Sequence, residues 1–283
     1  PKQNVFPKYL LHAINSPTAK RQFNAGLKGI GVPNLHLSVI RKTEIDIPGI
    51  EMQVHICRKL DKLISIIEKR EQELHELDNL IKSRFVEMFG EPSSNSKGYP
   101  EKLLPEIAEY WNGLTYKPED VSDEGTIVLR SSNIQNAALD FADTVRVVCN
   151  IGEKKYVQDN DILMCSRNGS ARLVGKVALI KNLSEPMTFG AFMMIIRSRY
   201  YPYLMTYFQM DAFRRQIATG ATTTINQITG NMLSKISLPL PNMADINEFA
   251  TFVEQTDKSK LAIQQSLDKL ELLKKSLMQE YFG

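Results

Sequence analysis

The sequence predicts an α+β fold, in which a globular domain with a mixed or antiparallel sheet lies between two long helices that form an antiparallel coiled coil. Three observations predict it: an internal repeat offset by 193 residues, helical spacing of apolar residues in both copies, and short β-branched runs between the copies. A length of 283 residues is sufficient for one large domain or two smaller ones.

The repeat is clearest at the ends of the two helical segments. Residues 72–90 (QELHELDNLIKSRFVEMFG) align without a gap with residues 265–283 (QSLDKLELLKKSLMQEYFG), and nine of the 19 positions are identical. The same offset pairs Pro48 with Pro241, each of which closes a strand-like apolar run. Each copy continues to its final glycine without another proline, which is typical of one long helix.

Apolar residues recur with alternating steps of four and three in both segments, which is the heptad pattern of a coiled coil. We expect helices over residues 48–90 and 241–283, each roughly 55–65 Å long at 1.5 Å per residue. An ordinary helical bundle is the alternative, and two equal helices around a 150-residue insert make it less attractive. The residues expected to pair the helices or to bind a partner are Leu60, Leu63, Ile67, Leu74, Leu77, Leu267, Leu270 and Leu277.

The segment before the first helix is a looser repeat of the segment before the second. Residues 6–29 resemble residues 201–223, with Arg21-Gln22 aligned to Arg215-Gln216. We therefore expect residues 1–47 to be the C-terminal remnant of a first α+β domain whose front is absent, and residues 91–240 to be a second, complete domain.

Residues 91–240 carry the pattern of an α+β domain. Strands are predicted at 126–129, 145–149, 161–165, 174–180 and 193–196, with turns at 123–125, 168–169 and 182–186. A helix is predicted over 202–217, followed by a loop of small hydroxylated residues, GATTTINQIT.

Composition and motifs exclude several classes of function. A hydrophobic content of 43% with 24% charged residues favours a packed core over disorder. No apolar run approaches the ~18 residues of a membrane span. The three cysteines are scattered and the four histidines lack ligand spacing, which argues against a zinc site and a disulfide framework and fits a reducing cytoplasm.

Catalytic motifs are also missing from the sequence. It contains no phosphate-binding loop, no GxSxG or HExxH, and no Asn/Asp-Pro-Pro-aromatic tetrapeptide of the kind that holds a flipped adenine. We therefore expect no catalytic residues, no metal and no cofactor in this chain.

Three polar clusters on predicted loops are the candidates for DNA binding. Arginine and asparagine can bond the edges of bases, and serine and threonine can bond phosphates, while solvated turns are the alternative explanation. Residues 91–240 carry 16 Lys/Arg against 15 Asp/Glu, so any DNA-binding surface must be local and weak in isolation. The candidates are Arg130, Ser131 and Asn133; Ser166, Arg167, Asn168, Ser170, Arg172 and Lys176; and Arg214, Arg215, Thr222, Thr223, Thr224 and Asn226.

The order of these segments resembles the specificity subunits of type I restriction-modification systems. The sequence IDIPGIEMQ at 45–53 is similar to the family's Pro-x-x-x-x-Gln lead into its conserved helix. Asn160-Asp161-Ile162-Leu163, followed by SRNGSARLVGKVALI, is similar to the family's target recognition domains. The second copy, LPNMADIN, departs from the pattern because it lacks the glutamine.

The resemblance implies a non-catalytic subunit that reads one half of a bipartite site in double-stranded DNA. The helices would fix the spacing of the half-sites and dock modification subunits that use S-adenosylmethionine to methylate adenine N6. A motor-nuclease restriction subunit with ATP and Mg²⁺ would complete the complex. The alternatives are a coiled-coil scaffold with a protein-binding α+β domain, an enzyme with an unfamiliar site, and a half-length subunit that homodimerises.

Overall fold

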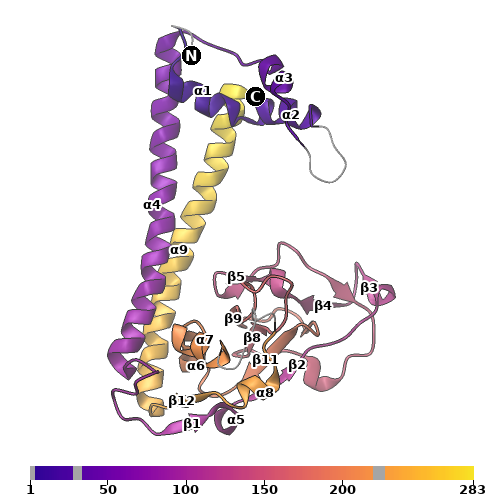
Figure 1. The fold of residues 1–283 in the computed structure, drawn as a ribbon, viewed down its shortest axis with the longest axis vertical. Coiled ribbons are helices and arrows are strands. Elements are labelled where there is room, and N and C mark those ends of the chain that lie inside the picture. Colours follow the sequence, from indigo (N-terminus) through magenta and orange to yellow (C-terminus); the bar gives the residue numbers. More distant parts are fainter. Residues whose placement is uncertain (1–3, 28–33, 219–226) are drawn as a thin grey trace. The chain divides into compact units, whose positions relative to one another are not determined.

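The structure is a computed structural model that describes residues 4–27, 34–218 and 227–283 (Figure 1). They form two compact units. Unit 1 comprises Pro1–Asp78 and Thr256–Gly283, and unit 2 comprises Asn79–Gln255. The boundary between the units falls inside both long helices, so each unit contains one end of each helix.

The two long helices are α4 (Ile50–Phe89) and α9 (Met243–Phe282), and each has 40 residues. They begin and end within two residues of the predicted bounds, which confirms the helical part of the fold. At about 1.5 Å per residue each is roughly 60 Å long.

Contacts within unit 1 show that α4 and α9 are antiparallel. Lys59 Nζ donates to the Tyr281 hydroxyl at 3.1 Å. Farther along α4, Asp78 pairs with Lys260 at 2.6 Å. Residue numbers therefore rise along α4 as they fall along α9.

The predicted pairing residues differ in burial. Three on α4 are buried, namely Leu60, Leu63 and Ile67. One cluster contains both Leu60 and Leu277, from opposite helices. The half-buried members of the predicted set are Leu74, Leu77, Leu267, Leu270 and Leu277.

Unit 1 adds three short helices to these ends: α1 (Pro7–Ile14), α2 (Pro17–Ala25) and α3 (Leu37–Lys42). Gln53 on α4 is fully buried, and its side chain holds the preceding chain in place. Its Oε1 accepts from Phe6 N at 2.8 Å, and its Nε2 donates to Pro48 O at 2.7 Å. The glutamine of IDIPGIEMQ therefore satisfies backbone groups that would otherwise be unpaired.

The sequence repeat extends to equivalent hydrogen bonds in the two units. In unit 1, Gln22 donates to Glu44 O and accepts from Glu44 N, both at 2.9 Å. In unit 2, Gln216 makes the same two bonds with Ser237, at 2.7 and 3.1 Å. Each glutamine thereby binds a helix to the extended segment before a long helix.

Two buried tyrosines repeat in the same way. Tyr9 donates its hydroxyl to Asp46 O at 2.8 Å, and Tyr203 donates to Pro239 O at 2.7 Å. Each ring also packs against the phenylalanine that precedes the final glycine of a repeat. The two copies are therefore equivalent in packing as well as in sequence.

Unit 2 contains a mixed set of sheets, as predicted. One four-stranded sheet is antiparallel, in the order β2 (Glu109–Asn112), β11 (Met193–Arg197), β8 (Ile162–Cys165) and β9 (Val177–Leu179). The second contains one parallel pair, in the order β10 (Met187–Phe189), β4 (Thr126–Leu129), β7 (Arg146–Val147) and β3 (Val121–Ser122).

Smaller elements complete unit 2. Two-stranded pairs join β1 (Glu101–Leu103) to β12 (Ser237–Pro239) and β5 (Ile134–Gln135) to β6 (Ala138–Leu139). The short helices are α5 (Leu104–Ile107) and α8 (Gly230–Leu233), with 3₁₀ turns at Pro118–Asp120, Ser131–Asn133 and Glu153–Lys155.

The antiparallel sheet is buried on both faces. Along β11, Met194 and Ile196 belong to one apolar cluster, while Met193 and Ile195 belong to another. Alternate residues of a strand point to opposite faces, so the sheet lies between the two clusters. This explains why β8, β9 and β11 are largely continuous apolar runs rather than alternating ones, whereas the edge strand β2 is partly exposed.

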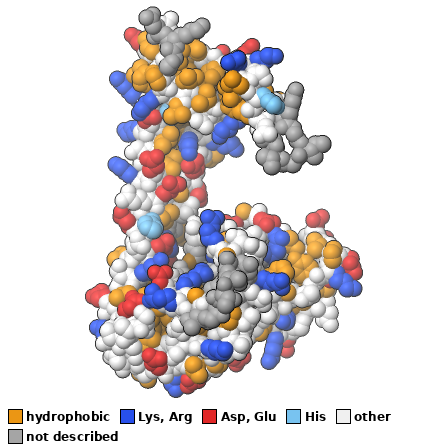
Figure 2. Space-filling view, viewed as in Figure 1, with side chains coloured by type: hydrophobic (Ala, Val, Ile, Leu, Met, Phe, Trp, Pro, Cys, Tyr) orange, Lys and Arg blue, Asp and Glu red, His pale blue; other side chains and the backbone are white. Residues whose placement is uncertain are grey.

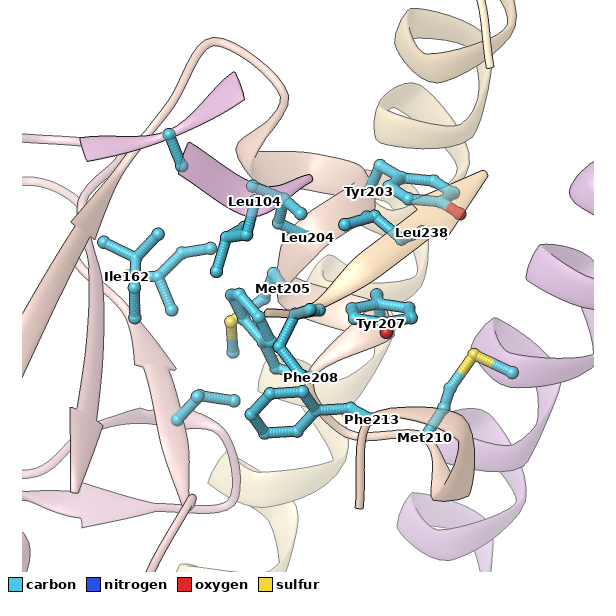
Figure 3. Close-up of a cluster of buried hydrophobic side chains, with 14 of the residues drawn as sticks. Leu104, Ile162, Tyr203, Leu204, Met205, Tyr207, Phe208, Met210, Phe213 and Leu238 are labelled. Atoms are coloured by element: carbon cyan, nitrogen blue, oxygen red, sulfur yellow. The ribbon is translucent and has the colours of Figure 1, made fainter. Parts of the chain in front are cut away.

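The predicted helix over 202–217 is wrong in one respect, because the structure has two helices there: α6 (Tyr201–Tyr207) and α7 (Asp211–Ala218). The break brings Phe208 and Phe213 together in the core, with ring centroids 4.9 Å apart (Figure 3). Burial of aromatic surface from both sides of the break outweighs the propensity for one helix.

A partly buried ion pair joins the last residue of β11 to the residue before β8. Asp161 is 1% exposed, and both its carboxylate oxygens accept from Arg197 at 2.7 Å. The Arg197 guanidinium also lies over the Trp111 ring, 5.0 Å from its centroid.

Arg197→Ala should lower the free energy of unfolding of unit 2 by about 3 kcal/mol, because the buried Asp161 carboxylate loses its cation. Trp111 is the single tryptophan, so its fluorescence during urea unfolding reports on unit 2. Arg199→Ala is the matched control, because Arg199 is exposed and stacks on the neighbouring Tyr200. It should cost less than about 1 kcal/mol. Equal unfolding midpoints for the two variants would contradict the assignment.

Candidate nucleic-acid interface

Two of the predicted polar clusters lie side by side. The first follows β4 and the second follows β8, and they are joined by a hydrogen bond from Asn168 Nδ2 to Ser131 Oγ at 3.1 Å. Lys176 Nζ donates to Ile134 O at 3.4 Å, which is a second link between the same loops. The fold therefore unites segments that are 37 residues apart in the chain.

The third cluster is only partly in the same place. The Arg214 guanidinium, on α7, donates to Val174 O in the loop after β8. Burial lowers the pKa of Arg214 from its ordinary value. Arg215 instead lies 3.2 Å from Ser93 Oγ and 3.5 Å from a Glu91 carboxylate oxygen, in the segment that follows α4.

Four further candidates lie outside the described residues, and they remain predictions. They are Thr222, Thr223, Thr224 and Asn226.

Two predicted DNA contacts are buried and serve the fold instead. Asn133 is fully buried, and its side chain accepts from Arg130 N and donates to the carbonyls of Asp140 and Asp143. Ser166 is 4% exposed and donates its hydroxyl to Phe192 O at 2.9 Å. Neither side chain is available to a DNA base in this conformation, because its polar atoms are used to hold loop backbone.

The accessible side chains of the two loops are mainly cationic. Arg167, Ser170 and Arg172 are exposed, and Lys176 is half-buried. Arg130 pairs with Asp143 at 2.8 Å, which partly neutralises it. Its Nε is buried, with no hydrogen-bond partner among the described residues.

This charge is a local feature. Figure 2 shows acidic and basic side chains interspersed over the visible face of unit 2. The group of cations on the two loops therefore stands out by its arrangement and not by the net charge of the unit.

One exposed aromatic residue was missed in the sequence. Phe192 is 60% exposed, and the Arg167 guanidinium lies over its ring, 5.4 Å from the centroid. It precedes β11, where the sequence shows only the start of an apolar run. No local pattern links it to Arg167, because the contact comes from the pairing of β8 with β11.

The described residues contain no group of three or more His, Cys, Asp or Glu side chains that could hold a metal ion. Within the same ranges, no helix is long and apolar enough to cross a membrane.

Comparison with known proteins identifies related sequences and folds. A profile of the type I restriction modification DNA specificity domain matches residues 1–78 and 97–275. The specificity subunit of the type I restriction enzyme EcoKI from Escherichia coli K12 is 28% identical over 166 residues. That match covers 54% of this chain and 36% of the relative, so the chain aligns with about a third of the relative's length.

Three solved structures share the fold at low sequence identity. The HsdS subunit of Thermoanaerobacter tengcongensis has a TM-score of 0.50 and 16% identity, over 99% of this chain and 71% of that one. The S subunit of a type I restriction-modification system from M. genitalium has a TM-score of 0.55 and 15% identity, over 99% of this chain and 73% of that one. A chain whose structure is described as the basis of complex assembly and conformational transition of the type I R-M system has a TM-score of 0.57 and 18% identity. The match covers 100% of this chain and 72% of that one.

Gly175→Ala should destabilise unit 2 by about 1–2 kcal/mol, because Gly175 has a φ of +77°, a left-handed conformation that is unfavourable for alanine. A Cβ there would also lie 2.8 Å from an Arg214 guanidinium nitrogen and displace it. Gly169→Ala, in the same loop, is the matched control, because its Cβ would meet nothing within 4 Å. It should stay within about 0.5 kcal/mol of the wild type in urea unfolding. Similar losses in both variants would refute the conformational argument.

Proposed function

The chain belongs to the type I restriction modification DNA specificity family, and on that premise we propose that it reads a specific sequence in double-stranded DNA. The observation that carries the proposal is the junction of two loops by the Asn168–Ser131 hydrogen bond. Arg130 and Arg167 are the chain neighbours of the two bonded residues, which supports a common surface for their side chains. Arginine can bond guanine O6 and N7 together, and a preformed loop pair gives such contacts a fixed direction.

In this proposal unit 2 reads one half of a bipartite site within a larger complex in the cytoplasm. The long helices set the distance between half-sites and dock the modification subunits. S-adenosylmethionine belongs to those subunits, and ATP and Mg²⁺ belong to a motor-nuclease restriction subunit. The chain itself supplies recognition and no catalytic residue. Exposed leucines on α9, such as Leu261 at 59% and Leu272 at 68%, support a partner on these helices.

The charge balance sets the expected strength of binding. The segment 91–240 has 16 Lys/Arg against 15 Asp/Glu. Non-specific attraction to phosphates scales with the number of cations that neutralise them, so it should be weak for the isolated chain. Tight binding to the target sequence then requires the modification subunits. A coiled-coil scaffold would show no preference for a DNA sequence even with those subunits present.

Arg167→Ala and Arg130→Ala should each reduce discrimination between the target and a scrambled duplex by at least about fivefold, because each loses a contact to a base edge worth about 1–3 kcal/mol. Methylome sequencing of the host, with and without this gene, supplies the target duplex. Binding of the chain with its modification subunits is then measured by gel-shift titration at several salt concentrations.

Lys181→Ala is the matched control for these variants. Lys181 is exposed and follows β9, at the end of the sheet opposite the loop after β8. Unchanged discrimination in both arginine variants would rule out those two side chains as readers. Absence of any sequence preference in the wild-type complex would refute the proposed function. Light scattering of the chain alone distinguishes a monomer from the alternative, a homodimer that restores two recognition units.

A further inference from the structure

Phe192 is an exposed aromatic side chain on a rigid support. It occupies the turn between β10 and β11, and 60% of its surface is exposed. A large apolar side chain loses favourable free energy when it remains in water. A single exposed residue needs no explanation by itself, so the inference depends on how the fold holds this one.

The backbone at Phe192 is anchored to the loop that contains the DNA-binding candidates. Its carbonyl oxygen accepts three hydrogen bonds: from Ser166 N at 3.0 Å, from Arg167 N at 3.1 Å and from Ser166 Oγ at 2.9 Å. The next residue, Met193, pairs with Cys165 at the end of β8, so the anchored turn leads directly into the β11–β8 strand pair. The turn is also closed by a bond from Met193 N to Gly190 O at 2.8 Å.

The contact with Phe192 also restricts Arg167. Its guanidinium lies over the ring at 5.4 Å from the centroid, within the range of a cation–π interaction. A planar guanidinium that is held on one face loses less conformational entropy when it forms a bidentate bond. Its bonding edge remains available because Arg167 is an exposed residue.

We propose that Phe192 and Arg167 form a composite reader, in which Phe192 contacts the thymine methyl group of the base pair next to the one that Arg167 bonds. This rests on the proposed function. Phe192 has no hydrogen-bonding group, and the 5-methyl of thymine is the one apolar group that a base pair displays in the major groove. The Ser166 hydroxyl acts as a positioning group for both side chains through the Phe192 carbonyl.

The test uses the chain in complex with its modification subunits and the target duplex identified by methylome sequencing. Each thymine of the half-site is replaced in turn by deoxyuridine, which removes only the methyl group. For the wild type, one replacement should weaken binding by about fourfold. This factor corresponds to the free energy of burying one apolar carbon group, here the thymine methyl. For Phe192→Ala, binding to the unmodified duplex should be weaker by at least that factor, and the same replacement should have no further effect.

The sensitive thymine should also be adjacent to the base pair at which Arg167→Ala loses discrimination. Val148→Ala is the matched control: Val148 is 63% exposed and lies beyond β7, opposite the start of β4 and away from Arg130. It should retain the wild-type response to deoxyuridine. Trp111 fluorescence in urea checks that every variant is folded.

Three results would overturn the inference while leaving the proposed function intact. In the first, Phe192→Ala discriminates normally and keeps full sensitivity to deoxyuridine. In the second, it weakens binding to target and scrambled duplexes equally, as loss of a backbone or wedge contact would. In the third, the half-site contains no A·T pair. If instead the wild-type complex shows no preference for its target, the proposed function itself fails.

Discussion

A buried tyrosine at the meeting point of the two long helices is the constraint on which each unit depends. In unit 2, Tyr203 packs against Phe85 and Phe89 with ring centroids 4.8 and 5.3 Å away, and these rings in turn contact Phe249 of α9. Burial raises the pKa of Tyr203, so its hydroxyl stays protonated and donates to Pro239 O. Aromatic pairs contribute about 0.5–1.5 kcal/mol each beyond their buried area, so this cluster holds the last turns of α4 against the first turns of α9.

The position of the candidate interface depends on this aromatic cluster around Tyr203. Tyr203 lies on α6, and the break after α6 directs α7 so that Arg214 reaches the loop after β8. The same loop is held from its other side by the Phe192 carbonyl, which precedes β11. The strands β8 and β11 that carry these loops are packed on both faces, in two apolar clusters. The packing of the interior therefore fixes the points from which the loops leave the sheet.

The sequence was informative where the signal is local or repeated. The long helices could be located because a gapless repeat and heptad spacing agree, and β4 was predicted with its observed bounds because TIVL is a short β-branched run between turns. The two-helix break at 208–210 could not be predicted, since tertiary burial of aromatic rings decided it. In the site, residue type identified the two loops, but not which side chains face inward. Asn133 and Ser166 have the same polar chemistry as their exposed neighbours. Phe192 meets Arg167, which lies 25 residues earlier in the chain, only through the pairing of β8 with β11.

For the proposed function, a nearly neutral unit must derive its specificity for DNA from the direction of its contacts rather than from charge. Long-range attraction to DNA grows with net positive charge, and the segment 91–240 has almost none. Three of its arginines are instead individually constrained: Arg130 by Asp143, Arg214 by Val174 O and Arg167 by Phe192. Such constraints reduce the entropy lost on binding, and they penalise a wrong base because a fixed donor cannot move to find another acceptor. In the proposed function, weak non-specific binding would be an advantage, because it leaves a larger difference in affinity between the target sequence and all others.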